Sequence, residues 1–293
     1  WTDYMAAPGD KVQYRVVPMI GPDKDNLAVD ATNASGWTPE ITLDYEFASK
    51  ISAYFNRGIV AAQWVSRRLG VTPTNLKSKE LEKVIDTPGD PMREFLMGPL
   101  GSRLFELLKK AADDKLEIYA ALYELHDKQL EAALKKLGQR AHVVLANGSV
   151  KKKGDDQNED ARTFLAGKID LHDRMISPNA LGHNKFLVVC DKQKKPRWVW
   201  TGSQNWTRTG LCTQANNSVL IDDKSIAGEY KKQWDLLQAA GNSTPKTLKT
   251  SNSTPRDRQI GSTKTRIWFT PTVGQVDLDE AKSIIEGAKD AIL

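Results

Sequence analysis

An alternation of amphipathic helix patterns and apolar strand patterns begins near Gly98. Apolar residues at helical spacing predict helices, and continuous apolar runs between them predict buried strands. In chain order the predicted elements are a helix over 102–113, a strand over 115–125, a helix over 128–137 that ends at Gly138, and a strand over 141–146. A strand, a helix and a second strand in this order form a parallel, right-handed crossover. The chain is therefore predicted to contain an α/β domain.

More strand patterns follow the crossover. The sequence predicts strands over 185–190, 197–201 and 217–221, and a helix over 225–239. The stretch 242–263 is rich in Ser, Thr, Pro and Lys, which is typical of a linker. We therefore expect a mixed β-sheet flanked by helices, as one domain over 95–245 followed by a linker over 246–264.

The first 94 residues have a different character. Alternating residues predict strands over 11–18 and 39–45, which resemble the end of a small β-sandwich. Apolar residues at helical spacing from Phe47 to Leu69 then predict a helix that stops at Gly70. Residues 1–94 are therefore expected to form an accessory segment, part β and part helical.

A short internal repeat follows the linker. Leu107, Leu108, Ala111 and Asp113 precede an apolar strand at Leu116, and a similar series precedes one at Ile292: Ile284, Ile285, Ala288 and Asp290. Repeated patterns of this kind indicate a duplicated architecture. Residues 265–293 are therefore expected to begin a second domain similar to the first.

Composition excludes several classes of protein. With 40% hydrophobic and 27% charged residues the chain is an ordinary globular protein, and no apolar run is long enough to cross a bilayer. The net charge of +5 mildly favours anionic partners, although 42 basic and 37 acidic residues also suit a plain soluble surface. The two cysteines form no metal-binding motif, and both a disulfide and two reduced thiols fit their number. The first residue is Trp1, so a removed targeting peptide and secretion stay open.

Polar residues that could take part in catalysis or binding lie in two nearby segments, HNKFLVVCD from His183 and TGSQNWT from Thr201. Residues two apart on a strand project from the same face, so His183 and Lys185 should point together. Ser203 and Asn205 should do the same if the backbone stays extended, and Gly202 permits a close approach of the chain. An imidazole, an ammonium, a hydroxyl and an amide suit a phosphodiester, because the imidazole can attack phosphorus or protonate an oxygen.

This pattern resembles the HxK motif with a downstream GSxN that characterises the phospholipase D superfamily. The resemblance covers roughly residues 99–240 and implies the α/β sandwich domain of that family. It also implies two-step phosphodiester displacement through a covalent phosphohistidine, with no metal or other cofactor. By match, His183 is the nucleophile or the general acid, while Lys185, Ser203 and Asn205 hold phosphate oxygens.

The family's site is shared between two halves, each with one motif. No second HxK occurs in this chain, so the resemblance implies a partner half, either from further sequence or from a homodimer. In the family's pattern four residues separate the Lys from an Asp. The corresponding position here is Cys190, and the carboxylate follows one residue later, as Asp191. A shift by one residue reverses the face of a strand unless a bulge absorbs it. Asp191 is therefore expected to support the structure more than the reaction.

Other residues near the motif carry weaker predictions. Trp206 is a candidate for the pocket rim, and Asn217 is a candidate supporting contact for substrate. His172 and His183 could be read as two metal ligands, but their spacing fits no helix face and no carboxylate completes a site, so no metal site is predicted. His126 and His142 attract no functional prediction.

Three functions fit these observations. Hydrolysis or transfer of phosphodiesters is favoured, with phospholipid headgroups as the leading substrate class. A nuclease of the same superfamily is the first alternative, supported by lysines at 151–153 and 192–195. A binding module with an incomplete site is the second, supported by the single motif. Lipid cleavage would need an exposed apolar rim, and nucleic acid a continuous basic groove.

Overall fold

The computed structural model describes residues 6, 8–58, 62–70 and 78–289. The chain divides into two compact units, Trp1–Phe47 and Ala48–Leu293. The functional residues predicted from sequence all belong to the second unit.

The first unit is built from short antiparallel pairs. Strand β1 (Lys11–Val12) pairs with β4 (Ile41–Thr42), and β2 (Met19–Ile20) pairs with β3 (Ala28–Val29). A 3-10 turn over Ala31–Asn33 follows, capped by the side chain of Asp30. The two predicted strand segments therefore do pair with each other, although the ladder between them is only two residues long. Membership of a β-sandwich stays a prediction.

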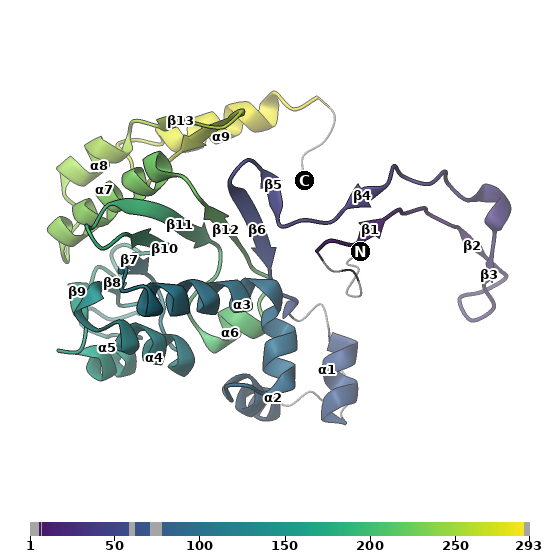
Figure 1. The fold of residues 1–293 in the computed structure, drawn as a ribbon, viewed down its shortest axis with the longest axis horizontal. Coiled ribbons are helices and arrows are strands. Elements are labelled where there is room, and N and C mark those ends of the chain that lie inside the picture. The colour runs from purple at the N-terminus through teal and green to yellow at the C-terminus, as the bar shows by residue number, and fades with distance from the viewer. Residues whose placement is uncertain (1–5, 7, 59–61, 71–77, 290–293) are drawn as a thin grey trace. The chain divides into compact units, whose positions relative to one another are not determined.

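An eight-stranded mixed sheet, whose first strand begins in the last residues of the first unit, forms the centre of the second unit (Figure 1). Its strands, in spatial order, are β5 (Glu46–Ala48), β6 (Ile51–Phe55), β12 (Asn217–Ile221), β11 (Pro196–Gly202), β10 (Lys185–Cys190), β7 (Glu117–Leu122), β8 (Ala141–Ala146) and β9 (Asp170–Arg174). Strands β7, β8 and β9 are parallel, and the pairs from β6 to β7 are antiparallel. The predicted crossover and mixed sheet are thus confirmed.

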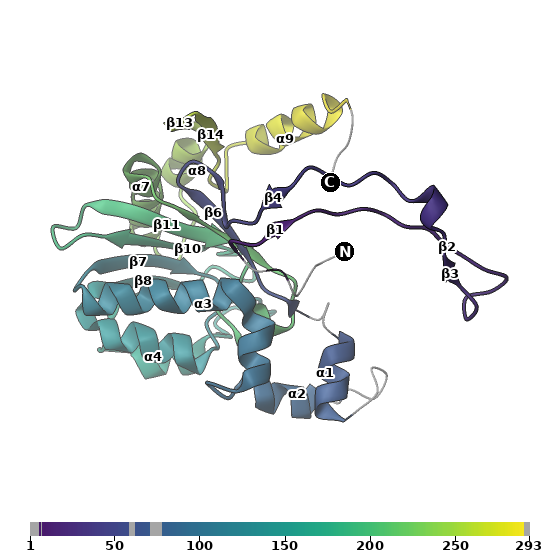
Figure 2. The ribbon, with the colours of Figure 1, turned by 45° about the vertical axis from the view of Figure 1, so that its right-hand side comes forward.

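Helices cover both faces of this sheet (Figures 1 and 2). One face is covered by α3 (Pro91–Asp113), α4 (Lys128–Leu137) and α5 (Glu159–Leu165), and the other by α7 (Lys224–Ala240) and α8 (Lys246–Asn252). The remaining elements are α1 (Ala62–Leu69), α2 (Ser78–Ile85), a 3-10 turn (Gly138–Arg140), α6 (Arg208–Cys212), the hairpin of β13 (Arg256–Ile260) with β14 (Thr263–Ile267), and α9 (Val276–Glu286). The α/β fold class predicted from sequence is confirmed.

The helix predicted from Phe47 to Leu69 is wrong in its first half. Residues 51–55 form strand β6, which pairs with β12 more than 160 residues later in the chain. Ile51 and Tyr54 are buried in the sheet, and a spacing of three residues fits one face of a helix as well as a bent strand. Only the second half is helical, as α1, and Ile59 lies outside the described residues.

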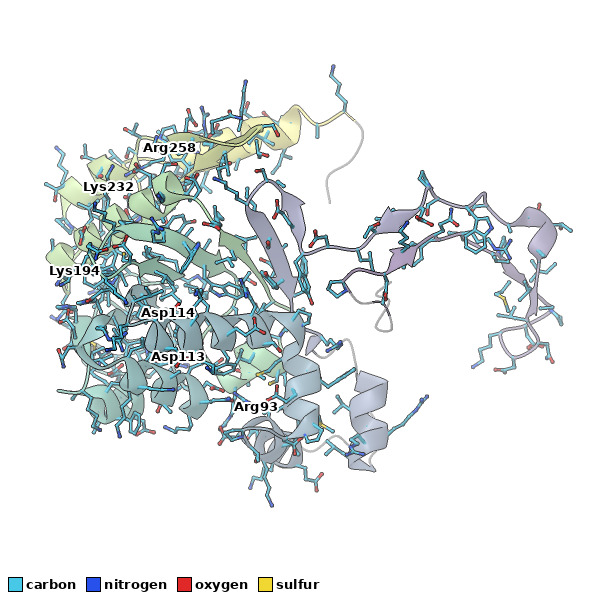
Figure 3. The ribbon with its side chains drawn as sticks, viewed as in Figure 1. Arg93, Asp113, Asp114, Lys194, Lys232 and Arg258 are labelled. Atoms are coloured by element: carbon cyan, nitrogen blue, oxygen red, sulfur yellow. The ribbon has the colours of Figure 1, made fainter. Side chains whose placement is uncertain are left out.

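The stretch predicted as a linker contains ordered elements. Helix α8 and strand β13 lie within it, and Leu248 and Ile260 are buried. Arg258 from β13 and Lys232 from α7 both pair with Glu229, which joins the hairpin to the helix, and Figure 3 labels both cations. The predicted helix before Ala288 is α9, while the predicted strand at Ile292 lies outside the described residues. The second half therefore stays a prediction.

The core contains both cysteines as free thiols. Cys190 and Cys212 are fully buried, and burial raises the pKa of each thiol to about 12. Of the two sequence-based alternatives, reduced thiols are therefore observed. Among the helices that the structure describes, none has the length and apolar character needed to span a bilayer.

Candidate phosphodiesterase site

The imidazole and the ammonium of the HxK segment lie against one aromatic ring. His183 meets the Tyr123 ring edge to face, with centroids 4.5 Å apart, and the Lys185 Nζ lies 4.9 Å from the centroid of the same ring. Lys185 pairs with Leu122 at the end of β7, so Tyr123 follows directly beside it. His183 is exposed and Lys185 is half-buried. The structure therefore brings these two side chains together at one end of the sheet, here called the motif end, where β7 ends and β10 begins.

The amide of Asn205 reaches the same end through a carboxylate. Its Nδ2 donates to Glu124 Oε2 at 2.8 Å, and Glu124 is the neighbour of Tyr123 in the chain. The backbone holds this arrangement, because Trp206 N–H donates to the Glu124 carbonyl and His126 N–H donates to the Trp206 carbonyl. Asn205 Oδ1 is buried without a hydrogen-bond partner among the described residues. The end of β7 thus joins the two parts of the motif.

Gly202 and Ser203 contact the start of β12. A Cβ at Gly202 would lie 2.2 Å from the Asn217 carbonyl oxygen, so only glycine fits there. The Ser203 hydroxyl donates to Asn216 Oδ1 at 2.8 Å, and its oxygen accepts from Asn217 N–H. Asn217, the predicted supporting residue, is exposed and contacts Ser203 through its backbone. Asn216 supplies the side-chain contact that sequence reasoning assigned to its neighbour.

Trp206 does not lie at a pocket rim. Its side chain is 1% exposed, and its backbone forms an isolated bridge with Leu125. The bridge joins the backbone of Trp206 to the segment after β7. A direct contact between its ring and substrate finds no support in this burial.

Asp191 lies at the other end of β10 from Lys185. Its Oδ1 accepts the backbone N–H groups of Gln193 and Lys195 at 3.0 Å each, which closes the turn between β10 and β11. The register of these strands shifts between Val189 and Cys190, as a bulge would produce. Cys190 is fully buried at the position where the family has its Asp. These contacts agree with the structural role predicted for Asp191.

Two buried polar groups that the sequence analysis missed hold the end of β7. Asn158 is fully buried, accepts the Leu125 N–H at 2.9 Å and donates to the Tyr123 carbonyl at 2.8 Å. Arg93, labelled in Figure 3, forms a buried ion pair with Asp127 at 2.8 Å, and Asp127 also caps α4. The segment that carries Glu124 is therefore fixed on both sides. No local pattern reveals such partners, because they come from distant parts of the chain.

The surroundings of the motif end lower the pKa of both the His183 imidazole and the Lys185 ammonium. Partial shielding of the ring from solvent, and then the charge of Lys185, lowers the pKa of His183. Burial lowers the pKa of Lys185 to about 8, against the opposing effect of Glu124. A neutral imidazole can act as a nucleophile, and a lysine that is still charged at neutral pH can bind a phosphate oxygen.

Two other histidines meet at the opposite end of β7, β8 and β9. His142 contacts Asp170 through Nδ1 at 2.5 Å and Glu117 through Nε2 at 2.7 Å, and His172 contacts Asp170 at 3.0 Å. Tyr119 stacks on the His142 ring at 4.3 Å. Within the described parts of the chain, no three His, Cys, Asp or Glu side chains are arranged to hold a metal ion. His172 therefore shares the Asp170 carboxylate with His142.

Comparison with known proteins shows which protein family this chain resembles. The family described as "Cardiolipin synthase, PLD-like domain" matches residues 104–237. The phospholipase D of Rickettsia conorii is 29% identical over 126 residues, which cover 41% of this chain and 58% of that protein. The phospholipase D of Rickettsia prowazekii is 27% identical over 128 residues, which cover 43% and 57%. The chain thus spans less than two thirds of the length of either relative.

Solved structures give a more distant likeness. The phospholipase D family member Nuc from Salmonella typhimurium has 20% identity and a TM-score of 0.39, and the match covers 49% of this chain and 91% of Nuc. NucT from Helicobacter pylori has 13% identity and a TM-score of 0.36, with 50% and 94% covered. The family match and the curated relatives agree with each other: residues 104–237 of this chain are similar to the PLD-like domain of the phospholipase D superfamily.

Proposed function

We propose that the chain supplies one catalytic half of a phosphodiesterase that cleaves or transfers phosphodiesters, with phospholipids as the favoured substrates. One observation carries the proposal. Tyr123 and Glu124, consecutive at the end of β7, contact His183, Lys185 and Asn205. A nucleophile, a cation and an amide donor therefore gather at one exposed end of the sheet.

The proposed reaction has two steps. An imidazole nitrogen of His183 attacks phosphorus, an N–P bond forms, and the bond from phosphorus to the leaving oxygen breaks. The leaving oxygen takes a proton from a general acid, which the motif of a second half supplies. Water or an alcohol then attacks the phosphohistidine, gives up its proton to that second group and releases His183. With the two halves exchanged, His183 would serve as the acid.

Lys185 and Asn205 stabilise the negative charge that develops during this reaction. Charge develops on the non-bridging phosphate oxygens in each transition state, and donors already held in place stabilise it without reorganisation. Glu124 holds Asn205 in place, and the Tyr123 ring supports Lys185. A second half, from further sequence or from another copy of the chain, completes the pair of motifs.

Two exposed apolar side chains support a lipid substrate. Leu181, two residues before His183, is 56% exposed, and Phe55, which pairs with Asn217 across β6 and β12, is 61% exposed. Both belong to the motif end, where acyl chains of a substrate would lie. Of the lysines that favour a nuclease, those at 192–195 belong to the turn at the other end of β10. Those at 151–153 follow the end of β8 and keep a nuclease as the alternative.

The test compares His183→Ala with the unchanged protein on phospholipid vesicles and on single-stranded oligonucleotides. We expect headgroup release to fall by more than about 10³-fold in the variant, because no other group replaces the imidazole. Turnover is expected to persist in chelator, as the family's metal-free chemistry implies. Near-normal turnover by His183→Ala would refute the site, chelator-sensitive turnover would refute the metal-free reaction, and turnover of oligonucleotides alone would establish the nuclease.

A further inference from the structure

A hollow of about 430 Å³ adjoins the motif residues. It is lined by charged and polar side chains from three segments: the end of β7 and the start of α4, the first turn of α5, and the residues after Trp206. Those that carry the argument are Glu124, His126, Lys128, Asp160, Thr207 and Arg208. The hollow belongs to no step of the reaction proposed above.

Glu124 connects the hollow to the phosphate-binding residues. Its carboxylate accepts the hydrogen bond from Asn205 and also lines the hollow. Thr207 lines it as well, two residues after Asn205 in the chain. A phosphodiester held by Lys185 and Asn205 would therefore extend one of its two ester groups into this space.

The cations of the hollow are neutralised from outside it. Lys128 Nζ lies 3.2 Å from Glu131, and the guanidinium of Arg208 lies 3.5 Å from Asp86 and 3.8 Å from Glu82. None of these three carboxylates lines the hollow. Each cation of the lining thus already has a carboxylate partner that no ligand needs to displace.

The carboxylates of the hollow lack such partners. Among the described residues neither Glu124 nor Asp160 has a cationic side chain within 4.0 Å, and Glu124 accepts a bond only from the neutral amide of Asn205. Burial, and then the charges of Lys128 and Arg208, lowers the pKa of His126 against the opposing effects of Glu124 and Asp160, so its ring is mostly neutral at pH 7. Its Nε2 is buried without a hydrogen-bond partner among the described residues. A group that enters the hollow thus meets two carboxylates that have no ion-pair partner among the described residues, beside the ring of His126.

The kind of cation follows from the lining. Quaternary ammonium groups are recognised by the faces of aromatic rings, and the described residues that line this hollow include no Phe, Tyr or Trp. Carboxylates, hydroxyls and an imidazole instead offer hydrogen-bond acceptors, which only an ammonium with N–H groups can use. We propose that the hollow binds the alcohol side of the phosphodiester, and that this alcohol carries a primary ammonium group, as in ethanolamine-headed phospholipids. The inference rests on the proposed function for the phosphodiester and names its substrate class.

The first experiment measures headgroup preference. Phospholipids with identical acyl chains and ethanolamine, choline or glycerol headgroups are compared in mixed micelles, and kcat/KM is expected to be highest for ethanolamine. Asp160→Asn should lower kcat/KM for the ethanolamine lipid roughly three- to tenfold, as for loss of a partly exposed ion pair, and change the glycerol lipid less than about twofold. Glu159→Gln is the matched control, because Glu159 lies in the same first turn of α5 but outside the hollow.

The second experiment needs no turnover. Ethanolamine and pyrophosphate are titrated separately while the imidazole NMR signals of the four histidines are followed. Ethanolamine should shift the His126 signal in the unchanged protein and in Glu159→Gln, and much less in Asp160→Asn. A shift of His126 with pyrophosphate alone, or equal turnover of all three lipids with no shift by ethanolamine, would overturn the inference. Absence of turnover on every phosphodiester, with His126 still shifted by ethanolamine, would overturn the proposed function and support the amine site.

Discussion

The two ends of β7 each carry histidine and carboxylate side chains beside a tyrosine. At the motif end His183 is exposed, and its ring nitrogens have no hydrogen-bond partner among the described residues. At the opposite end both ring nitrogens of His142 contact carboxylates, and its side chain is only 12% exposed. The histidine at the motif end is thus available to react, whereas His142 at the opposite end is engaged in contacts that stabilise the fold.

The difference teaches how a site is recognised in this fold. Buried polar atoms are normally paired, so unpaired ones call for an explanation. At the motif end Asn205 Oδ1 and His126 Nε2 lack partners in the described part of the chain, and Lys185 has a lowered pKa. At the opposite end the imidazoles and carboxylates satisfy one another. Unsatisfied groups together with exposure indicate chemistry, and satisfied groups indicate stability.

The largest effect expected from this comparison concerns two lysines that each lie over a tyrosine ring. Lys185→Ala should lower kcat/KM by about 10²-fold or more, because a positioned charge-stabilising group is lost, and Asn205→Ala should act similarly. Lys231, 4.2 Å from the Tyr119 ring at the opposite end, is the matched control, and Lys231→Ala should leave turnover within about twofold. Equal losses in Lys185→Ala and Lys231→Ala would break the distinction between the two ends.

The next effect concerns the stability of the fold, for which the opposite end should matter more than the motif end. His142→Gln should lower the free energy of unfolding by about 2–4 kcal/mol, because it leaves Glu117 and Asp170 without their shared partner. His183→Gln should change it by less than about 0.5 kcal/mol, as for an exposed residue. Urea unfolding monitored by circular dichroism measures both changes. A larger loss of stability in His183→Gln would contradict the account.

The stability contributed by Asp170 should also depend on pH. Burial alone would raise its pKa, but bonds from His142 and His172 hold that pKa below its ordinary value of 3.8. A carboxylate with a lowered pKa contributes stability above its unfolded pKa and loses it as the pH falls through the folded pKa. The difference between the unchanged protein and Asp170→Asn should therefore be full at pH 6 and shrink below pH 4 in urea unfolding. A difference that grows towards acid would contradict this sign.

The pH dependence of turnover tests the roles of His183 and Lys185 at the motif end. Lys185 must be protonated to bind phosphate, and its pKa of about 8 predicts that kcat/KM falls above about pH 8. His183 must be neutral to attack, and its lowered pKa keeps the acid limb below the ordinary value of 6.5. In Lys185→Arg the alkaline limb should move upward, because a guanidinium keeps its proton. An unmoved limb in that variant would assign the titration to another group.

The smallest effect is expected at Asp191. Asp191→Asn should change kcat/KM by less than about threefold, because its contacts close a turn at the end of β10 away from His183. Steady-state kinetics with the same phospholipid tests this value. A loss comparable to that of Lys185→Ala would mean that Asp191 takes part in the reaction.

The parts of this molecule that sequence predicts are those specified by local spacing. The closeness of His183 to Lys185 at the start of β10, the glycine at 202 and the crossover from β7 to β8 depend on neighbours in the chain. Glu124 and Asn158 could not be found in this way. They meet Asn205 and Leu125 through contacts 81 and 33 residues apart in the chain.

Errors arose where local patterns were ambiguous. Ile51 to Phe55 has apolar residues at a spacing that suits a helix, and only its pairing with β12 makes it a strand. The polar stretch after Asn242 contains α8 and β13 because a few apolar residues, among them Leu248, pack into the core. Tertiary contacts decide such segments, and one sequence does not display them.

Binding of orthovanadate, an analogue of phosphate, tests the central comparison most directly. The chain has four histidines, so their imidazole NMR signals can be assigned by single substitutions and followed during a titration. Vanadate should shift the His183 signal strongly, leave His142 and His172 unchanged, and lose its effect in Lys185→Ala. A titration that shifts His142 or His172 while His183 stays constant would show that the anion binds at the opposite end of the sheet and would contradict the account.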